Sequence, residues 1–99
     1  MEKEKRVIIP TINTNHNEDD TGLRISVNLA GASKDTVELD MGKEGLCVKA
    51  EGEDFRYDLC FMLAHRVKAE EARAKFEEGL MTIDVPFEET MSGHKVTVE

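Results

Sequence analysis

The stretch LRISVNL, residues 23–29, alternates apolar and polar side chains at every one of its seven positions. Side chains of a β-strand point alternately to opposite faces, so this spacing predicts a strand with one buried face. The same alternation recurs between turn signals along the rest of the chain and predicts further strands. They cover residues 37–41, 46–51, 55–63, 72–77 and 81–85, with short extended pieces at 7–9 and 96–98.

Residues 68–78 also contain many good helix formers, and a helix there is the competing interpretation. A helical stripe starting at Val67 would meet Glu70 and Glu71 before reaching Ala74, so it would lack a continuous apolar face. We therefore expect one helical turn near residues 68–71, followed by a strand. Seven or eight strands at this spacing are typical of an antiparallel, immunoglobulin-like β-sandwich, an all-β fold.

The strands at 46–51 and 55–63 are expected to form a hairpin with one shared buried face. A register in which paired residue numbers sum to 107 would place Cys47 opposite Cys60 on the outer face. A cross-strand disulfide is conceivable in that register. We nevertheless expect two reduced, partly exposed thiols, because few cysteines and no signal-peptide pattern in residues 1–6 are typical of a cytoplasmic protein.

The composition of the chain argues against two classes of function, nucleic-acid binding and membrane association. The chain of 99 residues has a formal net charge of −8, which argues against nucleic-acid binding because phosphate contacts need clustered Lys and Arg. No apolar run approaches the length of a membrane span, and we expect no membrane partner. The length suits one domain. We expect a charged N-terminal end at 1–6, a sandwich domain at 7–87 and a polar connection with a C-terminal extension at 88–99.

A search for catalytic or metal-binding chemistry gives no candidate site. Asp20-Thr21-Gly22 matches the triplet of dimeric aspartic proteases, but polar residues precede it where a buried strand is needed, so we interpret it as a turn. His16, His65 and His94 are isolated in polar surroundings, and we expect them to be exposed. We therefore expect no enzyme activity, no cofactor and no metal site.

Four stretches resemble motifs of the small heat shock protein (α-crystallin) family. Residues 74–86, AKFEEGLMTIDVP, resemble A-x-[FY]-x-x-G-V-L-x-[IV]-x-[LV]-P, and residues 61–67 are similar to the F-x-L-P-x-x-V before it. Residues 29–39 resemble L-P-G-x-x-K-[ED]-[DE]-[VI]-x-[VI], and residues 46–51 resemble L-x-[IV]-x-[AG]-E. Their order and spacing agree with the family over residues 7–98. The resemblance implies the immunoglobulin-like sandwich and a strand at 72–77.

The resemblance also implies a function, namely that of an ATP-independent holdase chaperone whose partners are partly unfolded client proteins. In the family, clients or tails bind a groove between two edge strands, which correspond here to residues 37–41 and 72–77. The candidate groove residues are Val37, Leu39, Ala74 and Phe76. The alternative interpretation is that these side chains fill the core.

The family's tail motif, I-x-[IV], corresponds to Val96-Thr97-Val98. The resemblance implies that Val96 and Val98 dock into the groove of a neighbouring copy. The alternative is that they form a last strand of their own domain.

Two departures from the family pattern affect assembly. At most about six residues precede the first strand, where the family usually has a long arm, and only residues 52–54 stand where a strand-swapping loop would be. A swapped dimer is therefore not expected. Edge-to-edge pairing with another copy through Phe55, Tyr57, Leu59 and Phe61 remains open, as does a monomer.

A rival hypothesis follows from those departures. The CS-domain co-chaperones share the sandwich, lack the swapping loop and act as adaptors on one folded partner. The absence of tryptophan and the fit of the stretch around Gly79 favour the heat shock family over this alternative.

Overall fold

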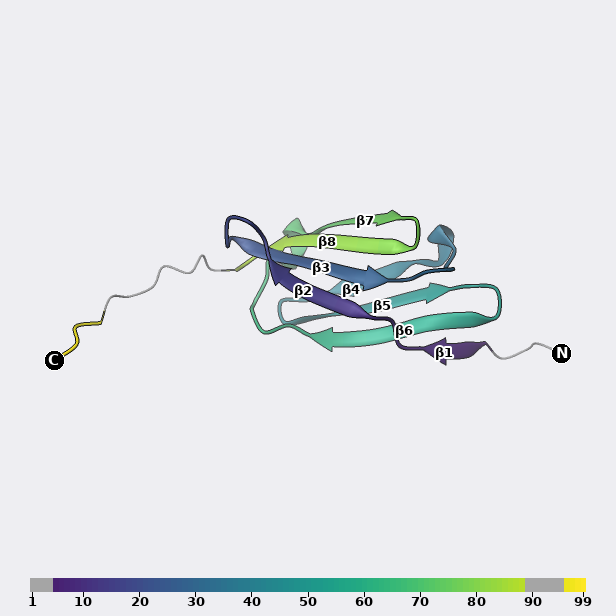
Figure 1. Ribbon diagram of the computed structural model, residues 1–99, viewed down its shortest axis with the longest axis horizontal. Helices are drawn as coiled ribbons and strands as arrows, with labels where there is room; N and C mark the ends of the chain where they lie inside the picture. The colour runs from purple at the N-terminus through teal and green to yellow at the C-terminus, as the bar shows by residue number, and fades with distance from the viewer. Residues whose placement is uncertain (1–4, 89–95) are drawn as a thin grey trace.

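Two four-stranded sheets make up the protein, which is known from a computed structural model describing residues 5–88 and 96–99 (Figure 1). The first sheet has the strand order β1-β6-β5-β4 and the second has the order β2-β3-β8-β7. The strands are β1 (Arg6–Ile8), β2 (Ile12–His16), β3 (Gly22–Asn28), β4 (Glu38–Met41), β5 (Gly45–Glu51), β6 (Phe55–Met62), β7 (Arg73–Glu77) and β8 (Leu80–Pro86). The predicted all-β sandwich is thus confirmed.

The core lies between the sheets and follows from the alternation in the sequence. In β3, β5 and β8 every second side chain is buried, and the residues between them face outward. The buried apolar residues are Leu23, Ile25, Val27, Leu29, Leu46, Val48, Ala50, Val67, Met81, Ile83, Val85 and Phe87. Each sheet therefore has one face that is removed from water, which is the main favourable term in folding.

The short extended piece at the N-terminus is more involved in the fold than expected. It forms β1, which pairs in parallel with β6, with Arg6 opposite Phe55 and Ile8 opposite Tyr57. Just before this strand, the Lys5 ammonium lies 3.5 Å from the Glu51 carboxylate. All other strand pairs are antiparallel.

The hairpin of β5 and β6 has the register in which paired residue numbers sum to 107, one of those that a shared buried face allows, with Cys47 opposite Cys60. The expectation of two reduced thiols is wrong, because the two cysteines form a disulfide. The physical reason is proximity: their Cα atoms lie 4.0 Å apart on directly opposed positions, with both side chains on the outer face. The position of the two cysteines in the hairpin, rather than the small number of cysteines in the chain, is therefore what indicates the bond.

Strand β2 and the histidines correct another expectation. His16 belongs to β2 rather than to a loop, and it is not isolated. Its ring lies 5.1 Å from the His65 ring and 5.3 Å from the Phe87 ring, in edge-to-face contacts. His65 also packs against Phe87, at 4.9 Å, so a small aromatic cluster forms near the end of β2. His94 lies outside the described residues.

Two short 3₁₀ turns precede the outermost strands of the two sheets. One covers Lys34–Thr36 and leads into β4, and the other covers Ala69–Glu71 and leads into β7. The second confirms the single helical turn predicted near residues 68–71. The Asp20 triplet forms a turn into the next strand, as expected: Asp20 and Thr21 precede β3, whose first residue is Gly22, and the Asp20 N–H donates to the Asn17 carbonyl at 3.1 Å. No helix in the described ranges is long and apolar enough to cross a membrane.

Candidate functional site

The site suggested by the sequence lies where the two sheets end on the same side. Among the described residues, β4 is the last strand of the first sheet and pairs only with β5, while β7 is the last strand of the second and pairs only with β8. The opposite ends, β1 and β2, are joined by residues 9–11 and so lie close together. β4 and β7 must therefore border the other side of the sandwich, and we call their inner faces together the β4–β7 edge.

Apolar side chains line the β4–β7 edge. Val37, Leu39 and Phe76 are half-buried and pack against the core, while Ala74 is exposed. The structure thus places all four predicted residues on the two edge strands or immediately before them. Three of them also support the core, so the two interpretations offered by the sequence are not exclusive.

Two further residues belong to the β4–β7 edge that the sequence reasoning did not select. Met41 and Ala72 are half-buried and pack against the core from the same strands or from the position just before. Their spacing could have identified them, because Met41 alternates in step with Leu39, and Ala72 in step with Ala74.

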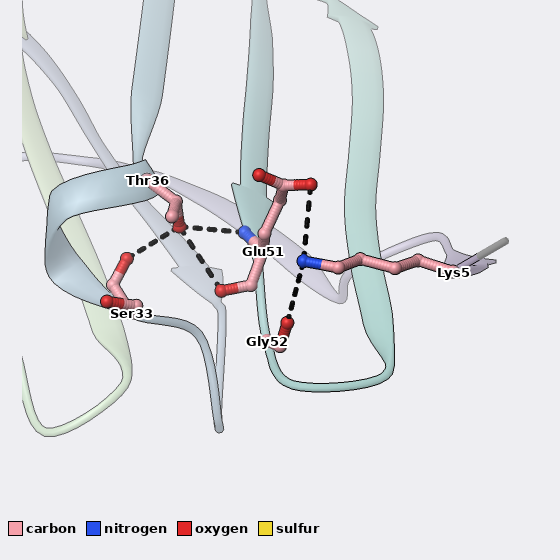
Figure 2. Close-up of polar contacts among 5 residues, drawn as sticks. All are labelled: Lys5, Ser33, Thr36, Glu51 and Gly52. Atoms are coloured by element: carbon pink, nitrogen blue, oxygen red, sulfur yellow. Dashed lines mark hydrogen bonds and ion pairs between the residues drawn. The ribbon is translucent and has the colours of Figure 1, made fainter. Parts of the chain in front are cut away.

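A hydrogen-bond network fixes the entry to β4 (Figure 2). The Thr36 hydroxyl accepts a hydrogen bond from the Glu51 N–H at 2.8 Å and donates to the Ser33 carbonyl at 2.7 Å. Figure 2 shows Lys5 reaching the same corner, where its ammonium donates to the Gly52 carbonyl at 3.2 Å. These contacts tie the start of β4 to the end of β5, so the β4 side of the site is held by the first sheet.

The outer faces near the site are charged, in contrast to the β4–β7 edge. On the outer face of β7, Lys75 and Glu77 form an ion pair at 3.1 Å. On β3 and β8, Arg24 Nε donates to Asp84 Oδ1 at 2.9 Å, and this hydrogen bond raises the pKa of Arg24 above its ordinary value. Exposed pairs of this kind add little stability but keep the outer faces polar.

The proposed dimer edge on β6 is only half available. β1 pairs with Phe55–Tyr57, so this half of β6 is already hydrogen-bonded within the chain (Figure 1). The Tyr57 hydroxyl also donates to the Ala30 carbonyl at 2.8 Å. Within the described residues, the half that contains Leu59 and Phe61 has no strand on this side. Pairing along the whole of β6 would require β1 to leave.

The tail residues lie apart from both sheets' strands. Val96 and Val98 are 78% and 93% exposed, and residues 96–99 form no strand. Neither valine is therefore part of a last strand of its own domain in this structure.

Comparisons with known proteins relate this fold to solved structures. No family model matches the sequence, and no curated protein matches it at a significant level. Solved structures do match. Heat shock protein 16.0 from Schizosaccharomyces pombe superposes with a TM-score of 0.71 at 15% identity, covering 93% of this chain and 76% of that one.

Two more solved structures extend the comparison. A mutant of hsp14.1 from Sulfolobus solfatataricus P2 gives a TM-score of 0.72 at 22% identity, covering 90% of this chain and 80% of that one. A small heat shock protein from Synechococcus phage S-ShM2 gives a TM-score of 0.63 at 22% identity, covering 93% of this chain and 98% of that one. The chain therefore has the α-crystallin-type β-sandwich fold of the small heat shock proteins.

Proposed function

We propose that the chain is an ATP-independent holdase that binds partly unfolded proteins at the β4–β7 edge and acts without catalysis. The observation that carries this proposal is the edge itself. It combines the outer sides of β4 and β7, which no strand of the described residues covers, with apolar side chains that are incompletely buried. The fold of the small heat shock proteins supports the same function.

The physical basis is a match between this edge and an unfolding client. A partly unfolded protein exposes apolar side chains and unpaired strand edges, which lead to aggregation when two such chains meet. The β4–β7 edge offers both complements: backbone groups of β4 and β7 for strand addition, and apolar contacts from Leu39, Ala74 and Phe76. Covering the client in this way needs no nucleotide.

The charge of the chain suits a holdase. With a net charge of −8, copies of the protein repel one another and remain dispersed when an apolar client covers part of their surface. The ion pairs on the outer faces of β3, β7 and β8 carry no net charge, but they keep those faces polar beside the apolar edge.

The proposal predicts suppression of aggregation by the chain alone. Light scattering is followed for two unrelated clients, one stressed by heat and one unfolded by reduction of its own disulfides. The chain is added at increasing molar ratios without nucleotide. We expect scattering to fall with the ratio for both clients. Unchanged scattering at large excess would contradict the holdase and favour an adaptor for one folded partner.

The reductant requires its own control, because the chain carries a disulfide. The heat-stressed client is therefore chosen to contain no cysteine, and its scattering is measured with and without the reductant used for the other client. A difference between these two arms would show that the state of Cys47 and Cys60 affects binding. Equal curves allow the two clients to be compared directly.

We further propose that the tail valines bind the β4–β7 edge of a neighbouring copy. Support comes from their exposure, from the apolar character of the edge and from their V-x-V spacing, which puts both side chains on one face of an extended segment. Valine buries about one methylene less than isoleucine, about 0.8 kcal/mol per site, so the contact is expected to be weak.

A double variant tests the tail contact. Replacing Val96 and Val98 with serine is expected to shift the mass measured by light scattering after size exclusion toward the monomer at high protein concentration. The matched control is Thr97→Ser, which changes the residue between them without removing an apolar anchor. An identical concentration dependence of mass for the double variant and the wild type would contradict tail docking.

A further inference from the structure

The Cys47–Cys60 disulfide lies on a face of the protein that the proposed function does not use. It joins β5 to β6 on the outer face of the first sheet, on the side away from the core. Cys60 is exposed and Cys47 is half-buried. Solvent and dissolved molecules can therefore reach the bond in the folded protein.

A pocket of about 450 Å³ opens beside the disulfide. It is hollow partly because two of its residues, Gly42 and Gly45, have no side chains. Gly45 lies opposite Met62, whose side chain is 73% exposed. Asp40 and both cysteines line it as well.

We propose that this disulfide is a thiol-exchange site for low-molecular-weight thiols, and that Cys60 is the sulfur they attack. Exchange requires the attacking sulfur to approach along the line of the disulfide, opposite the sulfur that leaves. For attack on Cys60 the approach comes from the far side of β6. Strand β1 covers that side only at Phe55–Tyr57, so no described strand blocks the approach at Cys60.

Attack on Cys47 is disfavoured by its neighbour. The approach there comes from the side of β4, where Asp40 is directly opposite Cys47 in the register. Asp40 is exposed and lines the pocket, so an incoming thiolate meets its negative charge. Asp58 is two residues before Cys60 but is itself paired in register with Lys49, whose charge has the opposite sign.

The chemical step is a thiol–disulfide exchange. A small thiolate attacks Cys60 Sγ and forms a new disulfide with it, while the Cys47–Cys60 bond breaks and its electron pair leaves on Cys47 Sγ. The Cys47 thiolate then equilibrates with its protonated form. A second small thiol attacks the mixed disulfide and releases Cys60. In total, two small thiols are oxidised to their disulfide and the protein disulfide is reduced to two thiols.

The exchange does not require unfolding. β5 and β6 are paired at seven positions, so the hairpin keeps its backbone hydrogen bonds when the disulfide opens. A small molecule bound to Cys60 would lie next to the half of β6 that β1 leaves uncovered. The bound thiol would therefore occupy the space beside this part of β6. It would not cover the β4–β7 edge.

Glutathione is the probe for the test. The oxidised protein is incubated with it under native conditions, trapped with N-ethylmaleimide at timed intervals and mapped by peptide mass spectrometry. We expect glutathione on Cys60 and maleimide on Cys47, with about a tenfold preference over the reverse. The opening rate is expected to lie within about tenfold of that in denaturant, where the preference should disappear.

Two variants separate the role of Asp40 from a general charge effect. Asp40→Asn is expected to raise the share of glutathione on Cys47. Glu38→Gln removes the same charge from the next outward position of β4, opposite Lys49, and should leave the share unchanged. The proposal would be overturned by a native disulfide that opens more than about tenfold slower than in denaturant. Adducts divided equally between the cysteines, or free thiols after air oxidation, would overturn it as well.

Discussion

Replacing Ala74 with aspartate is expected to raise the amount of protein needed for half-suppression of client aggregation by at least about tenfold. Ala74 is exposed on β7, so the folded protein can hold the new carboxylate in water. A client bound at the β4–β7 edge would cover that carboxylate with apolar surface and leave it without a partner, which is costly. A tenfold loss corresponds to only about 1.4 kcal/mol, well within that cost.

Thr82→Asp is the matched control for this prediction. Thr82 lies on the neighbouring strand β8, opposite Lys75 in the register, and faces outward. The substitution adds the same charge to the same sheet but outside the β4–β7 edge. Suppression curves for both variants are measured after circular dichroism has shown that each remains folded. Equal suppression by the two variants would mean that clients bind elsewhere.

Replacing Ile83 with alanine is expected to lower the free energy of unfolding by about 2–5 kcal/mol. Ile83 is fully buried in the middle of β8, between Ile25 on β3 and Ala74 on β7. Its truncation leaves a cavity that the two facing sheets cannot close without moving backbone. Domains of this size have a total stability of only about 5–15 kcal/mol, so the loss is a large fraction of the whole.

Urea denaturation measures this effect, and Thr82→Ala provides the comparison on the same strand. The adjacent side chain faces outward and is half-buried, so its truncation is expected to lower stability by at most about 1 kcal/mol. The denaturant slope should be the same for both, because the same surface is exposed on unfolding. A loss below about 1 kcal/mol for Ile83→Ala would contradict the packing of β8 between β3 and β7.

The strands that could be predicted are those with one buried and one exposed face. In β3 the buried Ile25 and Val27 flank the outward Ser26, and this alternation is visible in the sequence. The same rule limited the register of β5 and β6 to odd sums of paired residue numbers, because a shift by one residue would place the apolar side chains of the two strands on opposite faces. For the β4–β7 edge, the alternation indicated only which side chains face the core, and the choice of these two strands came from the resemblance to the small heat shock proteins.

β2 could not be predicted, because nothing in its side chains distinguishes it from a loop. Of its five residues only Ile12 is half-buried, and the others are exposed. It is held by backbone pairing with β3, from Ile12 opposite Val27 to His16 opposite Leu23. A strand that buries almost no apolar surface leaves no hydrophobic period in the sequence. The aromatic cluster around Phe87 was missed for the same reason.

The parallel pairing of β1 was also beyond the sequence. Arg6 and Val7 are exposed, so burial does not specify which strand they join. The choice of β6 depends on the position of the edge after the rest of the sandwich has formed, together with the contacts of Lys5 at the end of β5. The pairing partner of β1 is therefore determined by tertiary structure and not by the local sequence.

The order of strands along the chain has a consequence for synthesis on the ribosome. Leu23 of β3 pairs with Val85 of β8, and Arg6 of β1 pairs with Phe55 of β6. The early strands therefore leave the ribosome well before the strands with which they pair. At about 5–20 residues per second, the apolar face of β3 stays without its β8 neighbour for roughly 3–12 seconds. Contacts so distant in sequence also slow folding. During that interval the nascent chain itself exposes the kind of strand edge that leads other proteins to aggregate.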